Sequence, residues 1–295
     1  MRVIVLTRSD KHYTEEEGGY CIAGLDYDDR TRWVRLLGQH YKMKIANAEA
    51  VYEDGTICAP LDIIEVNDAV RVDEEFYNAN NGRYALTDYR IQPENYIVPV
   101  APFVKLGRIS IDEVLRCAPI SDSRYIFGNT GKSLSVEEAI ANNSSLVLIK
   151  VEDLLLEPKN RHNEDGYQAH YRASFTYNGV RYSDISVTDP DYAAELTDFD
   201  RLSFGDTFMI VSLGELYERE YQGRTLRDHF KIVAKIFETV YTIPNNRLGY
   251  FHAFKDCRYL ERYRNSLQRA LWQEMEAEGK QPCPTCMGRL DGALE

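Results

Sequence analysis

The chain has 295 residues, of which 44% are hydrophobic and 28% charged, and its formal net charge is −12 at pH 7. This composition is typical of a globular protein and excludes a disordered chain, and the length predicts two or three compact domains. The sequence has no run of about 18 to 20 uncharged apolar residues, and its apolar start is too short for a secretory signal. We therefore expect a cytoplasmic protein without a membrane-spanning segment.

The acidic total conceals a basic stretch. Residues 219–269 contain eleven basic and five acidic side chains, a net charge of +6, which leaves −18 for the rest of the chain. Such a stretch could contact the phosphates of a nucleic acid, or it could pair with the acidic remainder of the protein. The sequence leaves both interpretations open.

Short β-prone runs alternate with turn residues along most of the chain. The expected strands are residues 3–7, 20–25, 32–37, 61–66 and 96–100 in one group, and 145–151, 169–175, 180–187, 206–213 and 230–237 in another. Asn178-Gly179 between two runs predicts a hairpin, because both residues tolerate positive φ. Two groups of about five strands with little helix favour two small barrels in tandem over a doubly wound sheet.

Three helices are predicted. Ser110 with Glu113, and Ser135 with Glu138, have the spacing of a capping box, each ahead of a short apolar run. Over residues 253–279 apolar side chains recur every three or four positions, which predicts a long amphipathic helix ending at Gly279. That helix could dock into a groove of a protein partner.

Several segments resemble a known family in their order along the chain. They are 6–11 (LTRSDK), 19–26 (GYCIAGLD), 32–36 (RWVRL), 126–129 (IFGN), 186–190 (SVTDP), 210–215 (IVSLGE) and 230–235 (FKIVAK). This series resembles the dual OB-containing domain of bacterial proteins, several of which are associated with conflict or defence systems. The resemblance spans residues 1–238 and implies two OB-like barrels that recognise nucleic acid or a nucleotide-like ligand. It does not cover the rest of the chain.

A metal site is predicted at the end of the chain. The segment 282–288 (PCPTCMG) places Cys283 and Cys286 at a spacing from which two thiolates converge on one metal ion. His252 and Cys257 are the nearest further ligands, and the four would form a tetrahedral zinc site with a structural role. An unbroken helix over 253–279 would span about 40 Å and separate the two pairs, so the site requires a break near residues 264–266. Otherwise the two cysteines lie in an exposed tail.

Six residues are candidates for ligand contact: Arg8, Lys11, Tyr20, Trp33, Arg35 and Lys132. On an OB barrel, bases stack on aromatic side chains while Arg and Lys contact phosphates. Trp33 and Arg35 alternate with Val34 and so share one face of their strand, which is either an open binding surface or part of the core. Lys132 lies in a segment, GNTGKS, that lacks the first Gly of a phosphate-binding loop, so we interpret the segment as a turn and keep Lys132 as an anion contact.

The sequence as a whole predicts a mainly β (α+β) protein. We expect one OB-like barrel with helical insertions over residues 1–144, a second over 145–240, and a helical, zinc-stabilised appendage over 241–295. The expected function is non-catalytic binding or sensing of single-stranded nucleic acid or a nucleotide. Two alternatives stay open: a nucleic-acid-processing enzyme that uses the polar segment from His162 to His170, and a protein-interaction scaffold.

Overall fold

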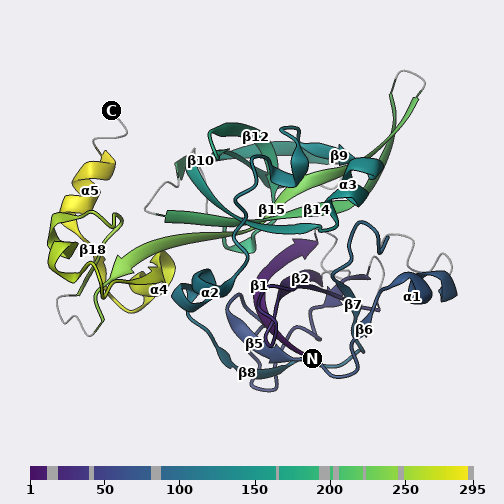
Figure 1. Ribbon diagram of the computed structural model, residues 1–295, viewed down its shortest axis with the longest axis horizontal. Helices are drawn as coiled ribbons and strands as arrows, with labels where there is room; N and C mark the ends of the chain where they lie inside the picture. Colours follow the sequence, from purple (N-terminus) through teal and green to yellow (C-terminus); the bar gives the residue numbers. More distant parts are fainter. Residues whose placement is uncertain are drawn as a thin grey trace.

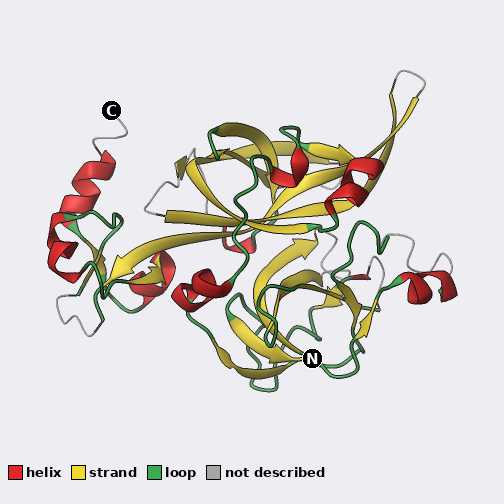
Figure 2. Cartoon of the chain, viewed as in Figure 1, coloured by secondary structure: helices red, strands yellow, loops and turns green. Residues whose placement is uncertain are grey.

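The structure is a computed structural model in which two β barrels lie one above the other and a smaller helical segment extends from the upper barrel (Figure 1). It describes residues 1–11, 19–39, 43–80, 88–163, 166–192, 200–201, 206–221, 224–244 and 249–291. The side chains of residues 10, 11, 158–170, 200, 201, 221, 224 and 291 lie outside this description. Strands dominate the two barrels, and the helices lie around them (Figure 2).

The first barrel is formed by residues 2–108. Its strands are β1 (Arg2–Lys11), β2 (Gly19–Asp26), β3 (Trp33–Leu37), β4 (Ile45–Ala46), β5 (Asp62–Glu65), β6 (Val70–Arg71), β7 (Asn95–Ile97) and β8 (Val104–Arg108). Hydrogen bonding follows the order β6-β7-β3-β2-β1-β5-β8, with β4 beside β2. β8 pairs with β5 at one edge of this sheet, while β7 pairs in parallel with β3 and is followed by β6 at the other edge. The barrel encloses an apolar core that includes Val5, Ile22, Val34 and Ile64.

The second barrel closes fully. Its strands are β9 (Ser133–Ser135), β10 (Leu146–Asn163), β11 (Gly166–Tyr177), β12 (Val180–Val187), β13 (Asp200–Arg201), β14 (Asp206–Tyr221), β15 (Arg224–Thr242) and β17 (Gln268–Leu271). Five of them form a ring in the order β10-β11-β12-β15-β14, because β10 pairs with both β11 and β14. The pairing of β12 with β15 is parallel, as is that of β3 with β7. This five-stranded closure is that of an OB fold.

The predicted Asn-Gly hairpin turn and the two helices predicted from capping residues are confirmed. The β11–β12 turn at Asn178 and Gly179 has φ values of 46° and 75°. Ser135 and Glu138 form a reciprocal capping box at the start of α3 (Val136–Asn142), and Ser110 caps α2 (Ile111–Cys117) through the Glu113 amide. The other α-helices are α1 (Glu74–Ala79), α4 (Trp272–Ala277) and α5 (Pro284–Asp291). None of the helices in the described ranges is long and apolar enough to cross a bilayer.

The prediction of one long helix over residues 253–279 is wrong. The chain instead forms the 3-10 helix η5 (Arg258–Tyr263), a turn at residues 264–266, strand β17 and the short helix α4. The apolar residues that suggested one helix face serve three different contacts: Cys257 and Leu260 pack around the C-terminal cysteines, Leu271 against α2 and the barrels, and Met275 against Phe251. The turn at residues 264–266 is the interruption that the predicted metal site needs, and strand β17 follows it.

The two barrels are joined by an apolar cluster and a buried polar contact. Ile4 and Leu25 of the first barrel pack with Ile210 and Phe237 of the second. Beside them, the Arg35 guanidinium donates to the Ser145 hydroxyl at 2.8 Å, the Ser145 carbonyl at 3.3 Å and the Ser212 hydroxyl at 3.1 Å. Ser145 also donates to the Glu94 carboxylate through its amide and its hydroxyl. Arg35 is only 7% exposed, so this contact fixes one barrel against the other in a site with little water.

Residues 126–142 lie before the domain boundary expected at residues 144 and 145. In the structure, β9 pairs with β15, and Phe127, Leu134 and Ala139 belong to the core of the second barrel. The three domain limits stay predictions.

Replacing Arg35 by Ala should destabilise the protein by about 3 kcal/mol, because it leaves buried polar partners unsatisfied at the barrel contact. The midpoint of urea unfolding measures the loss. Arg116→Ala is the matched control, since Arg116 is 68% exposed and pairs with Asp112 on its own helix; its cost should stay near about 0.5 kcal/mol. Equal costs for the two variants would show that the buried contact adds nothing.

Candidate metal centre and basic pocket

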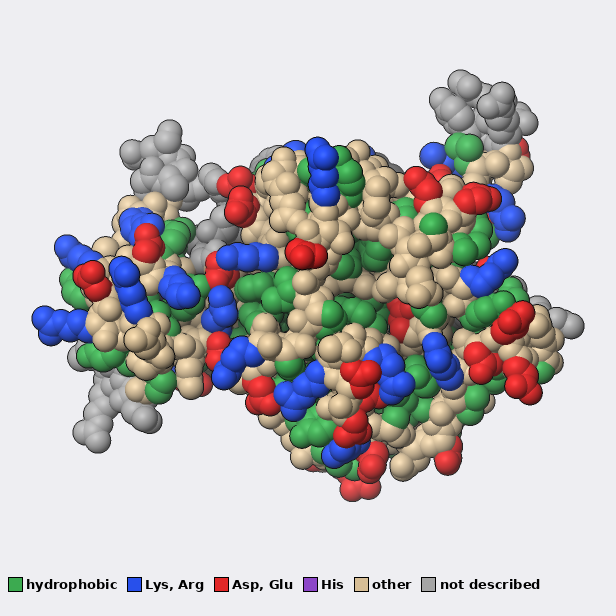
Figure 3. Space-filling model, in the orientation of Figure 1, with side chains coloured by type: hydrophobic (Ala, Val, Ile, Leu, Met, Phe, Trp, Pro, Cys, Tyr) green, Lys and Arg blue, Asp and Glu red, His purple; other side chains and the backbone are tan. Residues whose placement is uncertain are grey.

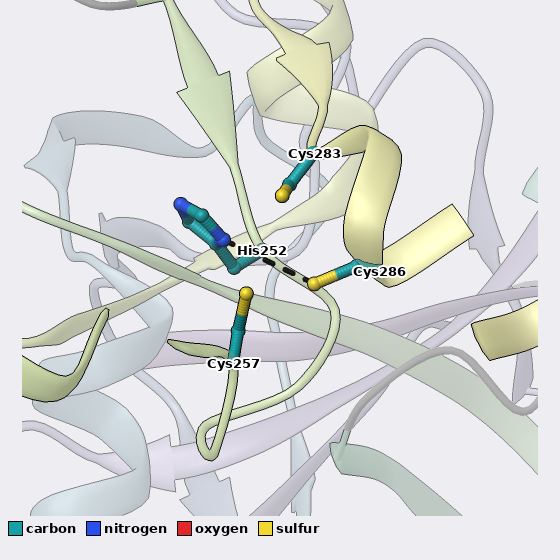
Figure 4. Close-up of side chains that lie close together, drawn as sticks. All are labelled: His252, Cys257, Cys283 and Cys286. Carbon is teal, nitrogen blue, oxygen red and sulfur yellow. Dashed lines mark hydrogen bonds between the residues drawn. The ribbon is translucent and has the colours of Figure 1, made fainter. Parts of the chain in front are cut away.

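Four potential metal ligands come together at the C-terminal end of the described chain. His252, Cys257, Cys283 and Cys286 are all buried, and their ligand atoms lie within 4.8 Å of one another (Figure 4). The Cys286 sulfur is 3.9 Å from Nδ1 of His252. The structure thus brings together the four ligands predicted from the sequence, although His252 and Cys286 lie 34 residues apart in the chain.

Strand pairing delivers the ligands to this cluster. His252 exchanges two backbone hydrogen bonds with Tyr241 at the end of β15, at 2.8 and 2.9 Å. The short strand β16 (Tyr250–Phe251) pairs in parallel with β18 (Gln281–Pro282), and the Cys283 amide donates to the Phe251 carbonyl. The Cys286 amide then donates to the Cys283 carbonyl at 2.9 Å, which closes the turn expected from the Cys-x-x-Cys spacing.

The donor set fits a tetrahedral metal ion. A metal–sulfur bond of about 2.3 Å places tetrahedral ligands about 3.8 Å apart, close to the observed separation of sulfur and imidazole. Burial raises the pKa of the Cys286 thiol to about 12, while amides of Phe254 and Ala253 oppose this shift. Since only a thiolate binds metal, an ion at this site would displace the thiol protons.

Two of the ligand-contact candidates on the first barrel lie together. The Arg8 guanidinium lies 5.1 Å from the centre of the Tyr20 ring and donates to the Cys58 carbonyl at 2.9 Å. Tyr20 is half-buried against the first core. The side chain of the third candidate, Lys11, lies outside the described residues.

Trp33 and Arg35 face the second barrel. Trp33 packs against the apolar cluster between the barrels, and Arg35 binds Ser145 and Ser212 there. Val34 points into the core of the first barrel. The face that Trp33 and Arg35 share is therefore covered by the protein itself, and the assignment of these two residues to ligand binding stays a prediction.

Lys132 lines a pocket of about 360 Å³ on the second barrel that sequence reasoning did not predict. The charged residues around it are Lys132, Arg172, Asp184, Arg219 and Lys231. Four cations thus surround one carboxylate, and Asp184 already pairs with both Lys132 and Arg172. Lys132 and Lys231 lie 99 residues apart in the chain, so no local sequence motif could have revealed the pocket.

The deepest cation of this pocket has no carboxylate partner among the residues the structure describes. Lys231 is 2% exposed, and its ammonium donates to the backbone and side-chain oxygens of Asn129, both at 2.8 Å. Burial lowers the pKa of Lys231 to about 8, although the nearby Glu138 carboxylate acts in the opposite direction. The Nε of Arg172 is also buried and makes no hydrogen bond in the described parts of the chain. A bound anion would give the Lys231 ammonium an opposite charge and the Arg172 guanidinium a further hydrogen-bond acceptor.

The enzyme hypothesis depended on His162 and His170, whose side chains lie outside the described residues. The backbone of His162 belongs to β10 and that of His170 to β11, and these two strands pair with each other.

The comparisons with known proteins identify the family. A family model described as the dual OB-containing domain matches residues 1–81 and 83–236. The chain therefore belongs to the dual OB-containing domain family, and the matched region leaves the C-terminal metal cluster uncovered. No curated protein matches the chain. Among solved structures, that of a murine DNA binding protein bound with ds DNA is 10% identical and covers 80% of this chain and 98% of that one, at a TM-score of 0.28. A likeness this low carries no argument.

Replacing Lys231 by Met should alter how stability depends on pH. Because the folded pKa of about 8 lies below the ordinary 10.5, the folded protein binds fewer protons than the unfolded chain between these values. Wild-type stability therefore rises with pH across this window, and the Met variant lacks this rise. Its stability relative to wild type should be highest below pH 8 and fall toward pH 10.5. Urea unfolding at pH 7 and pH 10 tests this, and an identical difference at both would contradict a buried ammonium.

Proposed function

We propose that this protein binds single-stranded nucleic acid or a nucleotide through its second barrel, without catalysis, with a phosphate in the pocket formed by Lys132, Arg172, Arg219 and Lys231. The single observation that carries this proposal is the pocket itself, in which four cations surround one carboxylate in a chain whose net charge is −12. A phosphate would add negative charge to that of Asp184, and it would supply oxygen acceptors for Lys and Arg.

The position of the pocket on the barrel supports the proposal. OB folds bind oligonucleotides on their second and third strands, beside the loop that joins the fourth and fifth. In this barrel those strands are β11 and β12, which carry Arg172 and Asp184, and the β14–β15 hairpin carries Arg219. Phe230 lines the same pocket, and its ring packs edge-on against Tyr217, which is 52% exposed. These rings offer surfaces on which bases could stack.

The proposal assigns zinc to the C-terminal cluster, with a structural role. Three thiolates and one imidazole are the closed ligand set typical of structural zinc, which leaves no position for a reacting water. Zinc would hold together a segment with a small apolar core, formed by Tyr241, Leu260 and Leu290 around the ligands. Several Lys and Arg side chains lie on the surface of this segment at the left of Figure 3, where they could contact further phosphates.

The protein-partner hypothesis relied on an amphipathic helix over residues 253–279 that does not form. A role in a bacterial defence system rests on the family resemblance alone, and a cytoplasmic location rests on the sequence.

Removal of Lys132 and Arg219 should weaken oligonucleotide binding and flatten its salt dependence. Each lost phosphate contact lowers the slope of log K against log salt by about 0.7 for a single strand, so Lys132→Ala with Arg219→Ala should lower it by about 1.4. Fluorescence anisotropy with a labelled single-stranded oligonucleotide across a salt series measures both quantities.

Arg116→Ala is the matched control for that series, because this exposed arginine lies on α2, away from the pocket. Its slope should equal that of the wild type. An unchanged slope in the double variant would place the phosphates elsewhere, and absence of binding by the wild type would refute the proposed function.

Purified protein should contain about one zinc ion per chain, and Cys283→Ser should lose it. Cys21→Ser is the control, since Cys21 lies on β2 of the first barrel and outside the cluster. Elemental analysis gives the metal content, and limited proteolysis should show that only the segment after residue 242 loses protection. Zinc that is well below one per chain and insensitive to Cys283→Ser would rule out the site.

A further inference from the structure

A second cavity lies where the two barrels and the C-terminal segment meet. It has a volume of about 150 Å³, and we call it the junction cleft. Residues of all three parts line it, among them Arg8, Arg108, Tyr192, Lys235, Glu238 and Glu274. None of the residues that the structure describes lines both the junction cleft and the basic pocket. An inference about the cleft is therefore independent of the phosphate pocket.

Glu238 of β15 is the unusual group in this cleft. The side chain is 8% exposed, and its Oε1 is buried without a hydrogen-bond partner in the described parts of the chain. Burial, together with the nearby carboxylate of Glu276, raises the pKa of Glu238 to about 8. At neutral pH the group therefore keeps its proton and presents one donor and one acceptor side by side.

The cations of the cleft do not neutralise Glu238. The Lys235 ammonium is held by Asp189, at 3.1 Å, and by Asp191. Arg108 pairs with Glu274 at 2.8 Å. These pairs leave the cleft with little net charge.

Arg8 is the second group with unused hydrogen-bonding capacity. Its Nη1 donates to Cys58, but its Nε is buried and has no partner among the described residues. The residues that line the cleft thus include one carboxyl oxygen, Oε1 of Glu238, and one guanidinium N–H, that of Arg8 Nε, without a partner in the described parts of the chain. Each would gain from a ligand that supplies the matching group, because buried polar groups without partners are costly.

The size and the walls of the cleft restrict that ligand. A cavity of about 150 Å³ admits a molecule as large as benzene. Ile236 and Leu271 provide apolar wall. The Tyr192 ring lies beside them, and burial together with the carboxyl groups of Glu238, Asp189 and Asp191 raises the pKa of its hydroxyl. The ligand is therefore a single six-membered ring that carries a donor and an acceptor side by side for Glu238 and a further acceptor for Arg8. A pyrimidine base has this pattern on its Watson–Crick edge, and Glu is a known partner of the cytosine amino group.

We propose that the junction cleft binds a pyrimidine base, with Glu238 pairing with the Watson–Crick edge and Arg8 donating to the ring carbonyl oxygen. The base belongs either to a free nucleoside or nucleotide or to a residue of a bound strand, since the ring chemistry is the same. The walls would reject purines by size.

Calorimetric titration of the full chain with cytidine, uridine, adenosine and guanosine at pH 6.5 tests the proposal. The two pyrimidine nucleosides should bind at least about tenfold more tightly than the purines. Cytidine has no ring N–H to lose, so it serves for a pH series, in which affinity should fall at least about tenfold between pH 6.5 and pH 9.5 as Glu238 loses its donor. No binding of pyrimidines, or equal binding of purines, would overturn the proposal.

Two substitutions at Glu238 sharpen the test. Glu238→Gln keeps one donor beside one acceptor and cannot titrate, so it should bind cytidine without the fall at high pH. Glu238→Ala should lose binding at every pH, and Glu137→Gln, an exposed acid on α3, should behave as wild type. A fall with pH that persists in Glu238→Gln would contradict the role of Glu238, even if the Ala variant does not fold.

Competition with an oligonucleotide separates the two sources of the base. If the site takes a base of a bound strand, an oligodeoxycytidine displaces cytidine; if it takes a free nucleoside, cytidine binding is unaffected. Either result supports a pyrimidine site. Lys132→Ala with Arg219→Ala should leave cytidine affinity unchanged, so failure of the phosphate pocket and failure of the junction cleft give different results.

Discussion

The backbone pairing of strand β15 is the constraint on which the rest of the structure depends. This strand has 19 residues and pairs with β9, β12, β14 and β17. It carries Lys231 at the basic pocket, Glu238 at the junction cleft and Tyr241 at the contact with His252. Because each position is fixed by hydrogen bonds to neighbouring strands, the two pockets and the metal cluster have fixed relative positions.

Lys231, Lys235 and Glu238 are three of the ionisable side chains buried on this strand, and they are compensated in different ways. The Lys235 ammonium pairs with the carboxylates of Asp189 and Asp191. The Asp189 carboxylate also accepts a hydrogen bond from the Ile236 amide, so this ion pair supports the fold. Among the described residues, the Lys231 ammonium donates to the two oxygens of Asn129 and forms no ion pair, and Glu238 keeps its proton. Groups whose pKa is shifted by burial are common at functional sites. Both proposed ligand sites contain such a group.

Much of the fold was predictable because its signals are local. Alternating runs gave the barrel strands, Asn178-Gly179 gave a hairpin, and Cys-x-x-Cys pointed to the metal cluster. The helix expected over residues 253–279 failed because spacings of three and four do not reveal whether apolar residues share one partner surface. The basic pocket and the junction cleft were missed for another reason. Arg172, Arg219 and Glu238 become notable only when distant strands pair and water is excluded around them.

The central claim is that a nucleic acid strand contacts the second barrel beside the β14–β15 hairpin. Ultraviolet crosslinking of a single-stranded oligonucleotide to the full chain, followed by peptide mapping, tests it most directly. The account predicts crosslinks to the peptides that contain Tyr217 and Phe230, whose rings border the basic pocket. Crosslinks confined to the exposed tyrosines of the C-terminal segment, such as Tyr259 and Tyr263, would contradict it.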